Sequence, residues 1–141
     1  PNGDRIPRSY GSMTYALLKS MLFAGLTQED PRVPAAFDWL QRNYTLDINP
    51  GFESSSDPLA PYQGLFYYFE GMARTLELMG NDTLTDAAGI EHDWRGELGG
   101  RLLAMQRQDG SWLNANSPRW WEGNPILATA YAVQTLESTL R

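Results

Sequence analysis

Residues 102–112 read Leu102-Leu103-Ala104-Met105-Gln106-Arg107-Gln108-Asp109-Gly110-Ser111-Trp112, and this stretch predicts the end of a helix, a tight turn and an anchoring tryptophan. Leu98, Leu102 and Met105 recur at helical spacing and indicate a buried face. Glycine tolerates the positive φ that ends a helix, so Gly110 marks the turn. We expect Trp112 to fold back over the last helical turn. We also expect the amide of Gln106 to meet the indole and to bond backbone groups of a neighbouring segment.

The spacing of this stretch resembles the Gln-Trp repeat of squalene–hopene cyclases and oxidosqualene cyclases, carried here by Leu102, Gln106, Gly110 and Trp112. Arg95-Gly96 resembles the basic–glycine pair that opens that repeat, and Arg101 stands where the repeat has an aromatic residue. Over roughly residues 10–140 the chain is similar to the prenyltransferase and squalene oxidase repeat group, which includes uncharacterised bacterial members. The resemblance implies an α/α toroid, in which about six pairs of helices close into a ring.

Composition narrows the classes of function. The 141 residues are 42% hydrophobic, which is enough for the core of one domain or of part of one. The net charge of −6, without a run of Lys or Arg, argues against nucleic acid or an anionic membrane surface as a partner. The absence of cysteine excludes disulfides and thiolate zinc sites. No apolar stretch is long enough for a transmembrane segment. The chain begins at Pro1, and we expect a processed or partial chain.

Apolar periodicity predicts an all-α fold of five helices that alternate between inner and outer positions. Three helices, at about 12–25, 62–79 and 126–140, are apolar nearly all round and are expected to be buried inner helices. Two, at about 28–44 and 94–106, are expected to be outer helices. Ser12 and Asp93 are candidate N-caps. Residues 1–9, 46–61 and 114–118 read as loops, and residues 83–85 and 90–92 allow a small hairpin.

The order of inner helix, turn, outer helix and loop repeats along the chain. Tyr15-Ala16-Leu17-Leu18 and Tyr131-Ala132-Val133-Gln134 occupy equivalent places 116 positions apart, which corresponds to two repeats of about 58 residues. Residues 1–141 are therefore expected to form a single segment of an α/α toroid, with two antiparallel helix pairs and one more inner helix. This ring is incomplete. We expect a second copy, or a missing segment of the parent protein, to cover its open edge.

Aromatic residues supply most of the candidate ligand-binding positions. In a toroid the inner helices line the central cavity, so Tyr15, Tyr67, Tyr68 and Tyr131 are candidates whose ring faces would stabilise a carbocation or stack on a sugar. The same spacing is typical of ordinary core packing. Trp121 lies in the loop Arg119-Trp120-Trp121-Glu122-Gly123, which is read either as a binding rim or as a lid over the helix pair.

Few ionisable residues suggest chemistry. Glu70 lies on an otherwise apolar helix and is interpreted either as an acid in a cavity or as the partner of Arg74 in an i,i+4 ion pair. His92 is the only histidine, and a metal site needs more ligands than the chain offers near it, so no metal or cofactor is expected.

The catalytic motifs of the resembling families are absent. The cyclases carry an Asp-x-Asp-Asp acid motif, and protein prenyltransferases hold zinc with Asp, Cys and His; neither set occurs here. We therefore predict a binding or scaffold module with an aromatic-lined cavity and a hydrophobic small molecule as its partner. The alternative is part of an enzyme that acts on isoprenoids or, by analogy with unrelated α/α toroids, on polysaccharides.

Overall fold

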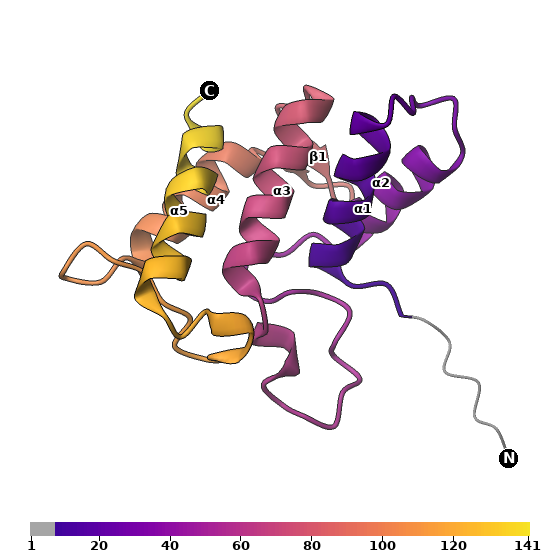
Figure 1. Ribbon diagram of the computed structural model, residues 1–141. Coiled ribbons are helices and arrows are strands. Elements are labelled where there is room, and N and C mark those ends of the chain that lie inside the picture. The colour runs from indigo at the N-terminus through magenta and orange to yellow at the C-terminus, as the bar shows by residue number, and fades with distance from the viewer. Residues whose placement is uncertain (1–7) are drawn as a thin grey trace, which may run out of the picture.

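Helices account for most of the computed structural model, which describes residues 8–141 (Figure 1). Of the loop predicted at residues 1–9, residues 1–7 lie outside the described part of the chain. A two-stranded antiparallel hairpin pairs Leu84 with His92 and Thr85 with Glu91, as the sequence predicts. The mainly helical class with one small hairpin is confirmed. The elements in chain order are α1 (Gly11–Phe23), α2 (Arg32–Arg42), η1 (Ala60–Tyr62), α3 (Leu65–Met79), β1 (Leu84–Thr85), β2 (Glu91–His92), α4 (Trp94–Met105), η2 (Arg119–Trp121) and α5 (Pro125–Thr139).

The helices form a row of three with two more helices against it. The central helix, α3, packs against α1 on one side and against α5 on the other, and all three run in the same direction (Figure 1). The remaining helices cover the flanks, because α2 packs on α1 and α4 packs on α5. The N-terminal ends of α1, α3 and α5 therefore lie at the same end of the molecule.

The core is centred on α3, whose buried side chains face both neighbours. Its largest buried residues are Phe66, Tyr68, Phe69 and Met72, and Trp94 of α4 is also fully buried. The prediction that the first helix is buried on both sides is wrong. Only α2 and α3 lie against α1, so one side of it is open and exposes Met13, Leu17 and Phe23. Within residues 8–141, no helix has the length and apolar character needed to cross a membrane.

One of the two predicted caps is wrong and the other is confirmed. Ser12 does not cap α1, which begins one residue earlier. The chain around residue 50 supplies the acceptors instead: the carbonyl of Pro50 accepts from the Gly11 N–H at 2.8 Å, and Oδ1 of Asn49 accepts from the Ser12 N–H at 2.9 Å. Asp93 caps α4 as predicted, because its carboxylate accepts from the backbone N–H three residues later at 3.1 Å.

The turn after α4 has the predicted form, with one difference. Gly110 has a φ of 82°, and the buried Trp112 folds back so that its Nε1 donates to the carbonyl of Leu102 at 2.7 Å. Gln106 does not reach a neighbouring segment. Its side chain is exposed and Nε2 donates to the carbonyl of Gly110 at 2.9 Å, inside its own turn. The bond to another helix comes from the backbone of Trp112, which donates to Oγ1 of Thr129 on α5 at 3.0 Å.

Removal of the Tyr15 hydroxyl is expected to stabilise the fold. This side chain is fully buried, and its hydroxyl is the one buried side-chain polar atom of the described residues that has no hydrogen-bond partner. An unsatisfied buried hydroxyl costs free energy, so we expect Tyr15→Phe to raise the free energy of unfolding by about 1 kcal/mol in urea titrations.

The matched control for this change is Tyr68→Phe. Tyr68 packs against Tyr15 with ring centroids 5.7 Å apart, but its hydroxyl donates to the carbonyl of Thr45 at 2.9 Å. Removing it is expected to lower stability by about 1 kcal/mol. Equal destabilisation by both changes would mean that the Tyr15 hydroxyl has a partner in solution.

Candidate functional site

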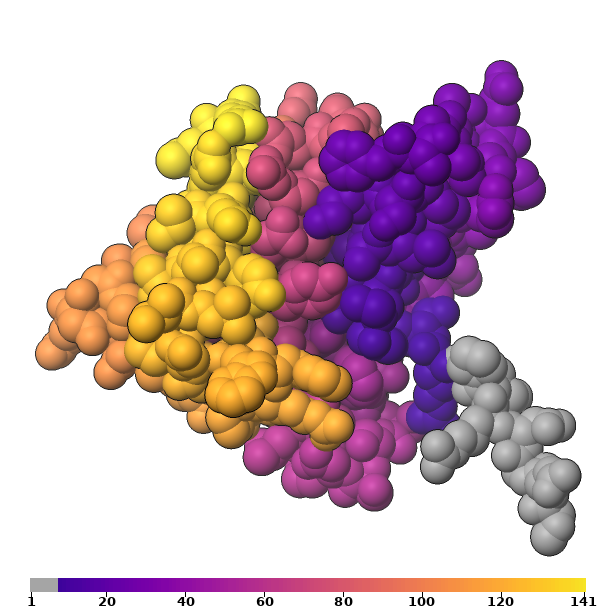
Figure 2. Space-filling model, in the orientation of Figure 1, coloured from indigo at the N-terminus to yellow at the C-terminus, as the bar shows by residue number. Residues whose placement is uncertain are grey.

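The main candidate site is a pocket of about 550 Å3 at the end of the molecule where α1 and α3 begin. In Figure 2 the segment before α5 projects toward the start of α1, and the surface is hollowed between them. Five separate parts of the chain line the pocket: the start of α1, the loop after α2, the start of α3, the η2 segment and α5. Its aromatic lining consists of Tyr10, Phe52, Tyr67, Trp120 and Tyr131, and its polar and charged lining of Ser12, Asn49, Ser55, Asp57, Gln63, Arg119 and Glu122.

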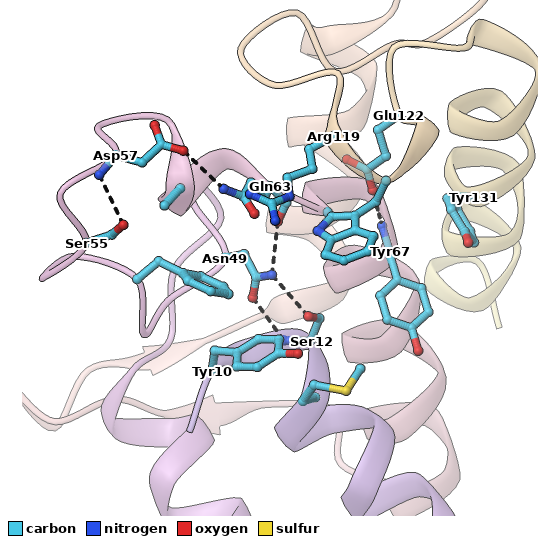
Figure 3. Close-up of a pocket in the computed structure, with 15 residues that line it drawn as sticks. Tyr10, Ser12, Asn49, Ser55, Asp57, Gln63, Tyr67, Arg119, Glu122 and Tyr131 are labelled. Atoms are coloured by element: carbon cyan, nitrogen blue, oxygen red, sulfur yellow. Dashed lines mark hydrogen bonds between the residues drawn. The ribbon is translucent and has the colours of Figure 1, made fainter. Parts of the chain in front are cut away.

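The aromatic rings form two pairs. Tyr10 and Phe52 pack with their centroids 4.8 Å apart, and Tyr67 and Tyr131 pack at 5.8 Å. Figure 3 shows Tyr67 and Tyr131 on one side of the polar residues at the centre of the pocket. A fifth ring belongs to Trp120. These distances are typical of aromatic contacts, and they leave ring edges and faces available to a bound molecule.

The η2 segment presents its two indoles from a strained backbone. Trp120 has a φ of 60° and Trp121 a φ of 65°, the left-handed region that side chains with a Cβ rarely adopt. Each such residue costs about 1–2 kcal/mol. Both indoles nevertheless remain largely in solvent, with exposed fractions of 64% and 79%. Strain that is not compensated by burial is typical of binding and catalytic sites.

The polar side of the pocket is organised by the Asn49 carboxamide. Its Nδ2 donates to Oγ of Ser12 at 3.0 Å and to the carbonyl of Gln63 at 3.1 Å, while its Oδ1 accepts from the Ser12 N–H (Figure 3). These bonds tie the loop after α2 to the start of α1 and to the residues before α3. Asn49 therefore fixes the pocket, and both of its amide hydrogens are used within the protein.

Glu122 places a fully buried carboxylate beside the pocket. Its Oε1 accepts from the Tyr67 N–H at 2.9 Å, and its Oε2 accepts from Nδ2 of Asn114 at 2.8 Å. Burial raises the pKa of the Glu122 carboxyl, and its hydrogen bonds partly oppose that rise. Gly64, at the N-cap of α3, has no side chain to cap the helix, so Glu122 supplies the acceptor from a distant part of the chain.

The structure brings some predicted site residues together and separates others. Tyr67 and Tyr131 both line the pocket. Tyr15 and Tyr68 are buried in the core between α1 and α3 and do not line it. Trp121 is exposed beside the pocket, and the preceding tryptophan supplies the lining indole.

The predicted ion pair between Glu70 and Arg74 is wrong. Glu70 lies 3.6 Å from Nζ of Lys19 on α1, and Arg74 instead lies 3.4 Å from Glu77. Glu70 faces a second, open hollow between α1 and α3 that is lined by the charged residues of these two pairs together with Phe23 and Leu78. Its carboxylate therefore links two helices and lies outside the aromatic pocket.

His92 joins the hairpin to the start of α4. Its Nδ1 lies 2.9 Å from Oε1 of Glu97 and its Nε2 lies 3.2 Å from Oδ2 of Asp86, so the two carboxylates are on opposite sides of the ring. The Tyr44 ring packs on the imidazole at 4.5 Å. Throughout the described part of the chain, no group of three or more His, Cys, Asp or Glu side chains is placed to hold a metal ion.

The contacts of His92 with Asp86 and Glu97 predict that the stability of the fold depends on pH. Partial burial lowers the pKa of His92, but the hydrogen bonds and charges of Asp86 and Glu97 outweigh it and raise the pKa above the usual 6.5. A raised folded-state pKa means stability that is complete below pH 6.5 and is lost as the pH rises through the folded-state value. His92 is the only histidine, so we expect the melting temperature to exceed that of His92→Gln at pH 6 by more than it does at pH 8.5. A difference that did not change with pH would contradict the ion pairs.

Several residues that line the pocket cannot be recognised as site residues from the sequence. Asn49 and Phe52 lie in the loop after α2, and Gln63 lies just before α3. The Pro, Gly and Ser content of residues 46–61 identified a loop but not a site, although binding residues often lie in loops. Tyr10 precedes the first helix, and Trp120 is predicted only as part of the loop at residues 119–123.

Comparison with known proteins adds no family assignment. No protein-family model matches the chain, and neither the curated proteins nor the solved structures contain a significant match.

Proposed function

We propose that this chain is a small-molecule-binding module and that its ligand occupies the aromatic pocket. The observation that carries the proposal is the convergence of five aromatic rings, from distant parts of the chain, on one cavity of about 550 Å3. Ligand sites in proteins are concave, of roughly 300–1,000 Å3, and combine apolar walls with a few fixed polar groups. The strained, solvent-exposed indoles of Trp120 and Trp121 at the same place support a site selected for binding.

The state of the buried polar groups favours binding over catalysis. Asn49 uses its whole carboxamide to hold neighbouring segments, and both oxygens of Glu122 accept hydrogen bonds. A general acid or base needs an atom free to meet the reacting group. The other lining groups are ring faces, the Gln63 amide, the Arg119 guanidinium and the Asp57 carboxylate, which together suit recognition of a ligand.

The test is a thermal-shift and calorimetric screen of the purified chain against four classes of probe: neutral oligosaccharides, isoprenoid alcohols, aromatic carboxylates and quaternary ammonium ions. We expect at least one class to raise the melting temperature. Trp120→Gly, which keeps the positive φ and removes the indole, should abolish that rise, whereas Phe23→Ala on the exposed end of α1 should not. Absence of binding by every class would overturn the proposal.

The second candidate, part of an enzyme that acts on isoprenoids, is favoured by one observation. Glu122 is a buried carboxyl with a raised pKa beside aromatic rings, which are the properties of a general acid that protonates an alkene. Incubation with squalene, followed by mass spectrometry of the extract, tests it. A cyclised product that disappears in Glu122→Gln would favour the enzyme, and recovery of unchanged squalene would contradict it.

We further propose that the row of α1, α3 and α5 is a segment of an α/α toroid whose open edge is covered by a second copy. The outer face of α5 supports this, because Ile126, Ala130 and Val133 follow one another at helical spacing and are exposed. The charged Glu137 ends this apolar stripe, and the exposed Leu140 follows the helix. An apolar stripe of this kind on a helix edge is typical of an interaction surface.

The expected result for the isolated chain is self-association. Light scattering should give about twice the monomer mass of 15.9 kDa. Val133→Lys should restore the monomer, because it places a charge in the stripe. Leu103→Lys, at an equally exposed position on α4, should leave the dimer intact. A monomer that binds no apolar dye would contradict both the dimer and the toroid.

A further inference from the structure

We propose that the ligand of the aromatic pocket is a neutral oligosaccharide, an inference that rests on the proposed small-molecule-binding function. The pocket combines aromatic faces with groups that donate and accept hydrogen bonds, and it contains charges of both signs. A pyranose ring has the matching chemistry, because its axial C–H groups form an apolar face and its equatorial hydroxyls both donate and accept.

The aromatic component of this recognition comes from both pairs of rings. Tyr10 precedes α1 and packs against Phe52 of the loop after α2, whereas Tyr67 and Tyr131 extend from α3 and α5 (Figure 3). The hydroxyls of Tyr67 and Tyr131 have no hydrogen-bond partner within residues 8–141. The phenol of Tyr131 is protonated at neutral pH and able to donate, and burial and then the charge of Glu122 raise its pKa further. Each ring therefore offers a face for stacking and a hydroxyl at its edge.

The polar component consists of three planar side chains. Oδ2 of Asp57 accepts from Nε2 of Gln63 at 3.5 Å, a long bond that leaves the carboxylate with further capacity as an acceptor, and Oε1 of Gln63 remains available. Arg119 stacks its guanidinium over the Trp120 ring at 5.3 Å and has no carboxylate partner within residues 8–141. Together these groups supply donors and acceptors in fixed planes, as the vicinal hydroxyls of a sugar require.

The same groups disfavour the other classes of ligand. An isoprenoid chain would bury the Arg119 guanidinium without a hydrogen-bond partner and would remove the Asp57 carboxylate from water, and each such burial is costly. An anion would meet Asp57, and it would find no free helix N-terminus, because Asn49 and Glu122 already accept the N–H groups that open α1 and α3. A quaternary cation would compete with the guanidinium that already lies over Trp120. A neutral polyhydroxylated ring avoids all three conflicts.

The length of the ligand follows from the η2 segment. Trp121 holds its indole outside the pocket, directly after the indole that lines it, and both residues keep a positive φ. A second sugar residue would lie against this exposed indole. This is the reason for an oligosaccharide and not a single sugar.

Isothermal titration of the purified chain with cellohexaose, xylohexaose, chitohexaose and maltohexaose tests the inference, with hexagalacturonate, farnesol and benzyltrimethylammonium as charged and apolar comparisons. We expect one of the neutral oligosaccharides to bind and its monosaccharide to bind at least tenfold more weakly. Trp120→Gly and Arg119→Ala should each weaken the oligosaccharide by about tenfold or more, the size of one lost stacking or hydrogen-bonding contact. Phe23→Ala is the matched control, and Tyr67→Phe tests a hydroxyl without removing a ring.

The outcomes separate the two levels of the proposal. Binding of farnesol, hexagalacturonate or the ammonium ion in the pocket, without any neutral oligosaccharide, would overturn the saccharide assignment and leave the binding function in place. No binding by any probe would overturn both. If Trp120→Gly melts at a lower temperature than the unchanged chain, Arg119→Ala and Tyr67→Phe still decide the result. Within residues 8–141 the Arg119 guanidinium contacts the Trp120 ring and forms no ion pair, and Tyr67 is held through its backbone N–H and not through its hydroxyl.

Discussion

Replacement of Trp112 by alanine is expected to lower the free energy of unfolding by about 3–5 kcal/mol. The indole is almost completely buried. Trp112 joins the end of α4 to α5 by two hydrogen bonds: its indole Nε1 donates to the carbonyl of Leu102 at 2.7 Å, and its backbone N–H donates to Oγ1 of Thr129 at 3.0 Å. Alanine keeps the backbone bond but leaves a cavity of an indole's volume and an unpaired carbonyl. Urea unfolding monitored by circular dichroism at 222 nm measures the change.

Gln106→Ala is the control within the same motif. Bonds to a neighbouring segment, which the sequence predicts for this side chain, would make the loss about 1–2 kcal/mol. The side chain is exposed and bonds only to Gly110 within its own turn, so we now expect a loss below about 0.5 kcal/mol. A Gln106 effect as large as that of Trp112 would show that the motif acts as a unit, as the cyclase repeat implies.

Replacement of Glu122 by alanine is expected to have the second largest effect, a loss of about 3 kcal/mol. The carboxylate is fully buried, and its removal leaves the Tyr67 N–H at the start of α3 and one N–H of the Asn114 amide without an acceptor. Thermal or urea unfolding measures the loss. Glu122→Gln is expected to cost less, about 1–2 kcal/mol, since one oxygen remains while the new NH2 group faces a donor.

The same residue predicts a dependence on pH. Burial raises the pKa of Glu122 in the folded state above the ordinary 4.5. The folded chain therefore binds more protons than the unfolded chain over this interval, so the associated stability is complete below pH 4.5 and is lost as the pH rises through the folded-state value. Glu122→Gln should lack this component. If the two proteins lost stability in parallel over that interval, the buried carboxyl would have an ordinary pKa.

Much of the local structure could be predicted from the sequence. The five helices, the hairpin, the Asp93 cap and the Gly110 turn all depend on residues close together in the chain, because helical periodicity, a capping carboxylate and a glycine at positive φ act over a few residues. The Ser12 cap was predicted wrongly because the start of α1 does not depend on nearby residues alone. Asn49 and Pro50 supply the acceptors at the start of α1, and they cannot be predicted from the residues next to the helix because they lie in a distant segment of the chain.

The candidate site was predicted less completely, for the same physical reason. Aromatic residues on an inner helix face either the core or the pocket, and the sequence marks both alike: Tyr67 and Tyr68 are neighbours, yet one lines the pocket and the other is buried. Glu70 was expected to pair along its own helix, whereas Lys19 of the adjacent helix was closer. Such choices depend on how the helices are placed beside one another.

The amino-acid sequence by itself determined which segments are helical, where they end and which residues are available for a core, because these properties follow from spacing and from the conformational preferences of single residues. Only the tertiary structure decided that Glu122 caps a helix begun far earlier in the chain, that Tyr15 lies in the core, and that Phe52, Trp120 and Tyr131 meet in one pocket. Those relations arise when α1, α3 and α5 align with their N-terminal ends together, and that alignment depends on the packing of side chains that no short stretch contains.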